Sequence, residues 1–332
     1  MLGAWANLST DKGLRLFNPF RDLPAVAVLL LQAFGDEMAL ESAASARALR
    51  LVSRFPFLSW MWLGADAWFD SDLVGFVWLE DGRIVGNADI APAASGRQWI
   101  LSNVAVEPQY RGRGIATALV RACIGYASRE GASTVLLQVW TRNEAARRLY
   151  EKEGFRPLSS VARLVRQAEP ALALPAAQCP EGWQWRDCQA SDVHRLSRVA
   201  GAMLPYEAQA VRPLSVAAFD ITLGERWRRL GRIAGRPWQA RQRVLIQGEA
   251  VLGGLALQRT AGTWRLVAVL PQVEAPLAAE CLAVEAVRLS ELAGGSAVIC
   301  DVPDHLGGYR RALEAAGFAY QDSLMQMSLT LS

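Results

Sequence analysis

Residues 104–117 read VAVEPQYRGRGIAT, an apolar strand that runs into a glycine-containing loop and then directly into a helix. Gly112 and Gly114 would let the backbone curl so that several N–H groups point into one concavity. The positive end of the following helix dipole would add to the attraction for an anion, and Arg111 and Arg113 could add charge at the rim. The stretch therefore predicts a pyrophosphate site, although a plain strand–helix turn with two flexible glycines has the same local pattern.

A second pattern follows on the C-terminal side of this loop. An apolar strand over residues 135–140 leads to Asn143, then to a helix bearing Tyr150, and then to Gly154-Phe155. Taken alone, an asparagine before a helix is usually a cap, and a tyrosine on a helix usually packs in the core. In this order and at these distances, the parts together indicate a more specific chemistry.

Together the two patterns resemble the GNAT N-acetyltransferase superfamily. Arg111, Gly114 and Ala116 fall on the marked positions of that family's pyrophosphate loop, Arg/Gln-x-x-Gly-x-Gly/Ala. The resemblance extends from Gly13 to about residue 166. It implies an enzyme that moves the acyl group of acetyl-CoA, its cosubstrate, directly to a primary amine of a small molecule or peptide.

The family's residue roles pass to this chain position by position. The backbone of residues 104–106 would bind the pantetheine arm at a strand splay or bulge, and residues 112–117 would hold the pyrophosphate. A backbone N–H near Val106 would polarise the thioester oxygen. Tyr150 would be the catalytic acid that protonates the leaving thiolate, since a phenol and a thiol have neighbouring pKa values. The implied acetyl-CoA contacts are Val104, Ala105, Val106, Arg111, Gly112, Arg113, Gly114, Ile115, Ala116, Thr117 and Asn143.

The general base stays open at this stage. Some relatives carry a glutamate on the strand before the asparagine, where this chain has Gln138, which cannot accept a proton. Others carry one on the strand that enters the pyrophosphate loop, but residues 99–103 contain no carboxylate. Asp89, Glu107 and a relay through water are therefore all candidates.

The two halves of the chain resemble each other. The Val-Ala-Val of residues 104–106 recurs at residues 267–269, an offset of 267 − 104 = 163. At this offset the matching segments are 104–109 with 267–272, 130–135 with 293–298, and 153–155 with 316–318. A looser match joins the Arg-Asp of residues 21–22 to the Arg-Asp of residues 186–187. Matches at one constant offset indicate a tandem duplication.

The second copy has lost the groups that would bind CoA. The corresponding pairs are Arg111 and Glu274, Gly112 and Ala275, Arg113 and Pro276, Gly114 and Leu277, Asn143 and Leu306, and Tyr150 and Leu313. The proline removes an N–H donor, and the glutamate puts a like charge where pyrophosphate would lie. We therefore predict a catalytic GNAT domain at residues 1–167, a linker at 168–180 and a degenerate GNAT-like domain at 181–332, with a structural role that extends to Asp301 and Tyr309.

Local patterns predict an α/β (α+β) fold, in which each domain is a mixed, mostly antiparallel twisted sheet flanked by helices. Asp81-Gly82 between two apolar runs predicts a hairpin. Asp22 is expected to cap a helix over residues 23–34, and a second helix is expected over 36–52. The other predicted strands are 13–17, 74–79, 84–90, 99–106, 135–140 and 155–164, and the other predicted helices are 113–129 and 143–153.

Composition narrows the partners and the compartment. A net charge of +3 on 332 residues favours neither nucleic acid nor a membrane surface, and the apolar run at residues 25–31 is too short to span a bilayer. The five cysteines show no metal-ligand spacing, so no metal is expected. Their odd number and dispersion suit a reducing, cytoplasmic compartment. A monomer and a homodimer are both compatible with these features.

One alternative function remains, a non-catalytic acyl-CoA-binding regulatory module. The presence of Tyr150 favours the enzyme, because binding alone needs no general acid. The missing glutamates favour the module. The acceptor is not identified: an aromatic group in the first copy could line its pocket or simply pack, and consists of Trp60, Trp62, Trp68 and Phe69.

Overall fold

The computed structural model describes residues 11–41, 74–93, 97–167, 179–203, 216–219, 241–260, 263–270 and 276–331. The chain divides into two units. Unit 1 comprises residues 1–139, 143–157 and 326–332, and unit 2 comprises residues 140–142 and 158–325. None of the helices in the described ranges combines the length and apolarity that crossing a bilayer requires.

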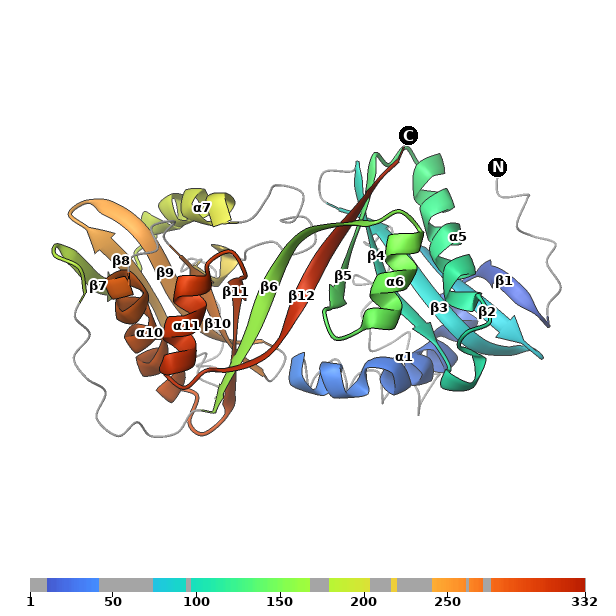
Figure 1. Ribbon diagram of the computed structural model, residues 1–332, viewed down its shortest axis with the longest axis horizontal. Helices are drawn as coiled ribbons and strands as arrows, with labels where there is room; N and C mark the ends of the chain where they lie inside the picture. The colour runs from blue at the N-terminus through green and yellow to red at the C-terminus, as the bar shows by residue number, and fades with distance from the viewer. Residues whose placement is uncertain are drawn as a thin grey trace. The chain divides into compact units, whose positions relative to one another are not determined.

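Unit 1 is a mixed sheet with helices on both faces (Figure 1). Its elements are β1 (Gly13–Leu16), α1 (Pro19–Glu41), β2 (Val74–Glu80), β3 (Arg83–Pro92), β4 (Gln98–Val106), the 3₁₀ turn η2 (Pro108–Tyr110), α5 (Ile115–Arg129), β5 (Thr134–Trp140), α6 (Glu144–Lys152) and the end of β12 (Ala319–Thr330). The pairs from β1 to β4 are antiparallel, and β4 pairs with β5 in parallel. Leu29 of α1 packs on Val77 from one face, whereas Ile115 of α5 lies against Gly86 from the other.

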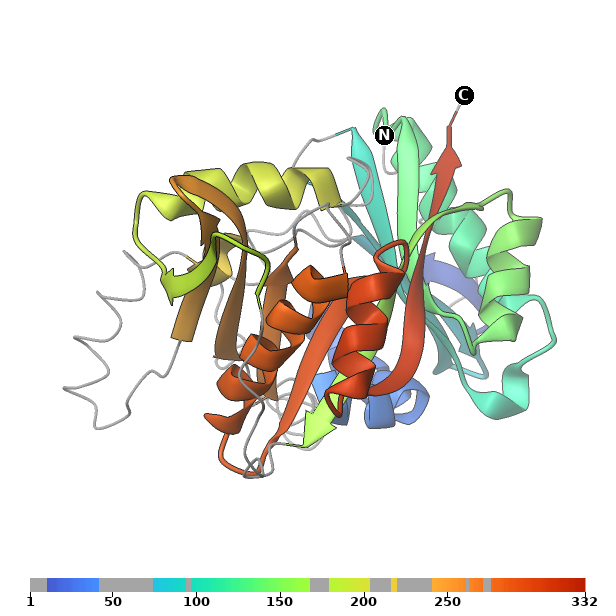
Figure 2. The same ribbon diagram turned by 60° about the vertical axis from the view of Figure 1, so that its left-hand side comes forward.

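Unit 2 repeats this order of elements. It contains β6 (Arg156–Gln167), β7 (Trp183–Asp187), α7 (Asp192–Met203), the 3₁₀ turn η3 (Val216–Phe219), β8 (Arg241–Gln247), β9 (Ala250–Thr260), β10 (Thr263–Val269), α10 (Pro276–Glu291), β11 (Ala297–Pro303), α11 (Gly307–Ala315) and most of β12. Helices α10 and α11 lie side by side (Figure 2). The predicted fold class is confirmed, since both units are mixed sheets flanked by helices.

The last strands of the two copies are exchanged. β6, from the first copy, pairs antiparallel with β11, and β12, from the second, is the neighbour of β5 in the strand order. Two backbone hydrogen bonds join residues of one copy to the exchanged strand of the other. Thr141 N donates to Ser323 O at 2.8 Å, and Asp304 N donates to Ser160 O at 2.9 Å. The two bonds are related by the offset of the repeat, since 304 − 141 = 163 and 323 − 160 = 163. The boundaries of units 1 and 2 therefore follow the pairing of the strands rather than the order of the two copies along the chain. The linker at residues 168–180 stays a prediction.

Helix α1 begins earlier than the sequence predicts. Asn18, rather than Asp22, caps it, because the Asn18 side-chain oxygen accepts the Phe20 N–H at 3.0 Å. The Asp22 carboxylate instead accepts two bonds from Arg15, at 2.6 and 2.7 Å. Burial opposes ionisation, but the hydrogen bonds from Arg15 and the Asn18 N–H outweigh it, so the pKa of Asp22 is lowered. The predicted break before residue 36 is also wrong, since α1 continues to Glu41, and residues 42–52 lie outside the described ranges.

The second copy uses the same ion pair at the same place. Arg186 of β7 donates to the Asp192 carboxylate at 2.6 and 2.8 Å, and these bonds lower the pKa of Asp192. Arg186 therefore corresponds to Arg15 of β1. The looser sequence match of residues 186–187 with residues 21–22 is wrong, because it aligns a strand with a helix.

Two of the cysteines form a disulfide. Cys179 and Cys281 are 102 residues apart in sequence, and their Cα atoms are 4.9 Å apart. Among the described residues, Cys123, Cys188 and Cys300 form no disulfide. The expectation of dispersed thiols is therefore wrong for this pair, which sequence spacing alone could not reveal. These two cysteines therefore do not support the prediction of a reducing compartment.

Candidate active site

Strands β4 and β5 separate within unit 1. They pair in parallel only where residues 98–100 lie beside residues 134–136. On its other edge, β4 continues to pair with β3 as far as Val106, which lies opposite Gly86. Residues 101–106 therefore present an edge toward β5 that no strand in the described ranges pairs with, and such an edge can bond an extended ligand.

A bulge interrupts β4 at this separation. Asn87 lies opposite Ala105 and Asp89 lies opposite Ser102, so three steps along β4 match two along β3. Asn103 absorbs the extra residue with a left-handed φ of 52°. The bulge stands at the start of the segment that the sequence predicts to bind the pantetheine arm.

The loop after β4, exposed over residues 111–114, leads to the first turn of α5. Gly112 and Gly114 have φ of 76° and 80°, a region that glycine enters at little cost. The helix begins at Ile115, later than predicted, and Ala118 N donates to the Gly114 carbonyl at 3.0 Å. The amides of the first turn precede this hydrogen-bond ladder and point outward from the helix end. A Cβ on either glycine would meet no atom within 4 Å, so the space beside them is open.

The two arginines of the loop bind to the chain itself. Arg111 Nε donates to the Val106 carbonyl at 3.1 Å, and Arg113 donates to the Gln109 carbonyl at 3.2 Å. The Arg113 guanidinium also lies 4.9 Å from the centre of the Tyr110 ring. These contacts fix the loop conformation while both arginines stay exposed. Among the remaining predicted contacts, Ala105, Val106 and Ile115 are buried, and Val104, Ala116 and Thr117 are partly exposed.

Helix α6 carries the other two predicted site residues. Asn143 caps it, since its side-chain oxygen accepts the Ala146 N–H at 3.2 Å. Tyr150 is buried, with its ring edge-on to Phe155 at a centroid distance of 5.8 Å. Burial, with a smaller contribution from Cys123, raises the pKa of Tyr150 to about 12. The phenol is therefore protonated at neutral pH, as a general acid must be.

Asp89 lies in β3, buried beside the bulge. Its carboxylate accepts from the Asn103 side-chain amide at 2.7 Å and from the Asn87 amide at 3.2 Å. Asn87 also donates to the Asn103 carbonyl at 3.1 Å. Burial raises the pKa of Asp89 to about 6, although both hydrogen bonds act in the opposite direction. Neither asparagine was predicted as part of the site, and a polar residue inside an apolar strand is the signal that could have revealed each one.

The two other positions considered for a base differ from Asp89. Glu107 is 3.5 Å from Arg83 and accepts from Gln109 at 3.0 Å, so neighbouring polar side chains engage it. Gln138 keeps a buried amide nitrogen that has no hydrogen-bond partner in the described part of the chain. Asp89 is thus a buried carboxyl group whose pKa of about 6 suits a base near neutral pH.

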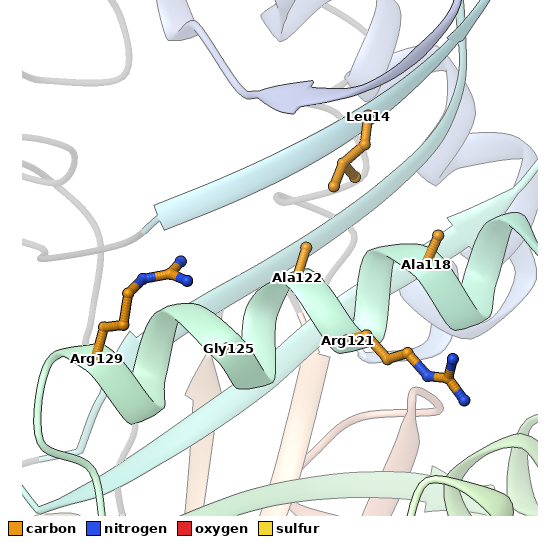
Figure 3. A pocket seen from close by; sticks show the side chains of 6 residues that line it. All are labelled: Leu14, Ala118, Arg121, Ala122, Gly125 and Arg129. Atoms are coloured by element: carbon orange, nitrogen blue, oxygen red, sulfur yellow. The ribbon is translucent and has the colours of Figure 1, made fainter. Parts of the chain in front are cut away.

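A depression of about 250 Å³ lies on α5, away from these groups (Figure 3). It is lined by Leu14, Ala118, Arg121, Ala122, Gly125 and Arg129. Arg121 is bound to Glu153 at 2.7 and 3.1 Å. None of the predicted site residues lines this depression. The described ranges hold no cluster of metal-ligating side chains, and the aromatic group at residues 60–69 falls outside them.

Known proteins share this sequence pattern and this fold. The model of the acetyltransferase (GNAT) family matches residues 45–155. N-acetyltransferase 8B of Rattus norvegicus is 30% identical over 161 residues, which cover 41% of this chain and 72% of that relative. The chain belongs to the GNAT family. Its predicted family is thereby confirmed.

Solved GNAT structures match nearly the whole chain. The GCN5-related N-acetyltransferase from Sphaerobacter thermophilus has a TM-score of 0.60 and 20% identity, covering 96% of this chain and 95% of its own. A tandem GNAT protein from the clavulanic acid biosynthesis pathway has a TM-score of 0.57 and 16% identity, with coverages of 96% and 98%. At these identities the likeness shows the tandem GNAT fold alone. The present GNAT chain spans 24%, 55% and 45% of the lengths of three further curated relatives.

Proposed function

We propose that this GNAT protein transfers the acetyl group of acetyl-CoA directly to the primary amine of a small molecule or peptide. The observation that carries the proposal is the run of backbone groups from the unpaired edge of β4 to the first turn of α5. The edge at residues 101–106 can bond the amides of pantetheine as a strand would. The amides of residues 112–117, at the positive end of α5, suit a pyrophosphate.

Asp89 and Tyr150 supply the proton transfers. The acceptor amine attacks the thioester carbonyl, an N–C bond forms, and the C–S bond breaks. Asp89, ionised above pH of about 6, accepts the amine proton directly or through a water. Tyr150 donates its proton to the departing thiolate and regains one from solvent. Holding both substrates together supplies much of the rate enhancement.

The alternative is a regulatory module that binds acyl-CoA without chemistry. Gln138 supports it, because an amide cannot act as a base where some relatives carry a glutamate. Tyr150 supports the enzyme, because a buried, protonated phenol adds nothing to binding of the pyrophosphate.

Calorimetric titration with acetyl-CoA tests the proposal, with ATP and NAD as controls. We expect one acetyl-CoA site per chain and no binding of the other two. A panel of primary amines is then assayed for release of the CoA thiol. Binding without thiol release from any amine would favour the regulatory module, and no binding by the folded protein would overturn both.

A further inference from the structure

The turn after β5 is held by an aspartate from the second copy. Thr141 Oγ1 donates to Asp322 Oδ1 at 2.5 Å, and the Ser323 N–H donates to the same oxygen at 2.7 Å. Arg142 Nη1 lies 3.4 Å from Asp322 Oδ2. Asp322 is only 6% exposed. All these contacts lie in unit 2, and they bind the two residues that directly precede Asn143.

The position of this turn matters to the chemistry of the first copy. Asn143 caps α6, and α6 carries Tyr150. Hydrogen bonds to a buried carboxylate are short and strong, and one that joins adjacent strands restricts the backbone on both sides. Fixing Thr141 and Arg142 therefore limits where the Asn143 side chain can point. Supporting contacts of this kind decide whether a binding group is held in its productive geometry.

The second copy contains a matching turn. Asp304 stands at the position of Thr141, since 304 − 141 = 163, and the Ser160 hydroxyl donates to its carboxylate. This turn leads to Leu306, which precedes α11 and makes no side-chain cap bond. Both turns are thus tied to an exchanged strand by a hydroxyl–carboxylate bond. The two turns differ at the start of the helix that follows: the first copy has the polar Asn143 there, and the second has Leu306.

We propose that Asp322 is a positioning residue for the acetyl-CoA site, acting through Thr141 and Arg142 to orient Asn143 toward the CoA arm. This inference rests on the proposed function. The second copy then contributes a side chain to the site of the first, beyond the structural role that the sequence predicts for it. The strand exchange is what brings that side chain to the end of β5.

Acetyl-CoA titration of matched variants of the full chain tests the proposal. Thr141→Val and Asp322→Ala should weaken binding about tenfold, because a released Asn143 side chain must be ordered again when acetyl-CoA binds. Asp322→Asn should recover most of the affinity, because its amide oxygen still accepts from Thr141. Ser160→Ala removes the bond from a hydroxyl to the Asp304 carboxylate at the second turn, so it should lower the melting temperature like Thr141→Val but leave the acetyl-CoA Kd unchanged.

Hydrogen exchange without ligand gives an independent readout. The amides of residues 143–147 should exchange faster in Thr141→Val and Asp322→Ala than in Ser160→Ala. Equal acetyl-CoA affinities for Thr141→Val and Ser160→Ala would overturn the proposal, as would unchanged exchange in a folded Asp322→Ala protein. If the unmodified protein binds no acetyl-CoA, the proposed function fails and the inference fails with it. If that protein binds and Asp322→Ala binds equally well, the inference alone fails.

Discussion

The two copies follow the same path through strands and helices, but their equivalent positions differ in chemistry. Tyr150 and Leu313 are both buried in the last turns of α6 and α11. Asn143 caps α6 through its side chain, whereas Leu306 at the same position makes no such bond. Packing needs only apolar volume, whereas a binding site needs particular polar groups. A copy can therefore retain the fold after it has lost the site.

A carboxylate on β11, the strand that follows α10, occurs in the copy that lacks the glycine loop. Asp301 corresponds to Gln138, since 301 − 138 = 163, and it pairs with Arg163 at 2.9 Å and with Arg265 at 3.5 Å. Two guanidinium groups hold this carboxylate in ion pairs, and its structural role stays a prediction. A single acidic residue does not make a catalytic site when the groups that bind the cosubstrate are missing.

The largest expected effect is on binding at the start of α5. Gly114→Glu should weaken acetyl-CoA binding by about 100-fold or more, because glutamate disfavours a φ of 80° and its charge repels a pyrophosphate. Leu277→Glu is the matched control, since 114 + 163 = 277 and Leu277 is 48% exposed. It should bind acetyl-CoA normally in calorimetry. Equal losses in the two variants would end the distinction between the copies.

The next largest effect is expected on the pH dependence of kcat/KM, through the proposed base Asp89. For the unmodified protein, kcat/KM should rise with pH through about 6, because only the Asp89 carboxylate accepts a proton. Asp89→Asn should remove that limb of the profile and lower kcat/KM at pH 8 by about 100-fold or more. An unchanged profile in the variant would assign the proton to another group or to a water relay.

The same group should affect stability with the opposite pH dependence. The pKa of Asp89 is raised from 3.8 to about 6 on folding, so its stabilising contribution is complete below pH 3.8 and is lost as pH rises through 6. This component amounts to about 3 kcal/mol. Urea unfolding at several pH values should show it in the unmodified protein and not in Asp89→Asn.

A smaller effect on kcat is expected from changing the proposed general acid, Tyr150. Tyr150→Phe should lower kcat about 100-fold while the acetyl-CoA Kd stays nearly constant, since the ring remains and only the proton donor is lost. Leu313→Met, a change that preserves volume at the equivalent position, should leave kcat unchanged. Steady-state kinetics with calorimetry separates the two quantities, and a parallel loss of both in Tyr150→Phe would contradict the assignment.

The smallest effect is at the helix cap. Asn143→Ala should cost about 1 kcal/mol of stability, because α6 loses the bond to the Ala146 N–H. Leu306→Ala has no cap bond to lose, so any loss there comes from its buried side chain. Adding acetyl-CoA should leave the difference in melting temperature between the unmodified protein and Leu306→Ala nearly unchanged, but widen it for Asn143→Ala. Identical shifts in both would mean that Asn143 acts as a cap alone.

Much of the fold was predictable because its signals are local. Asp81 and Gly82 take φ of 50° and 72° at the predicted hairpin, where few other residues would fit. Asn143 was correctly placed before α6. The start of α1 was not, because the partner that occupies Asp22 is Arg15, a residue on a separate strand.

The sequence by itself determined the family, the order of elements and the duplication at a constant offset, since each depends on neighbouring residues or on self-similarity along the chain. Tertiary structure alone decided the exchange of β6 and β12, the Cys179–Cys281 disulfide and the raised pKa of Asp89. The partner of a strand depends on which edges meet when the chain closes, and a pKa depends on how much water burial removes. A local sequence pattern therefore determines neither the partner of a strand nor the pKa of a buried group.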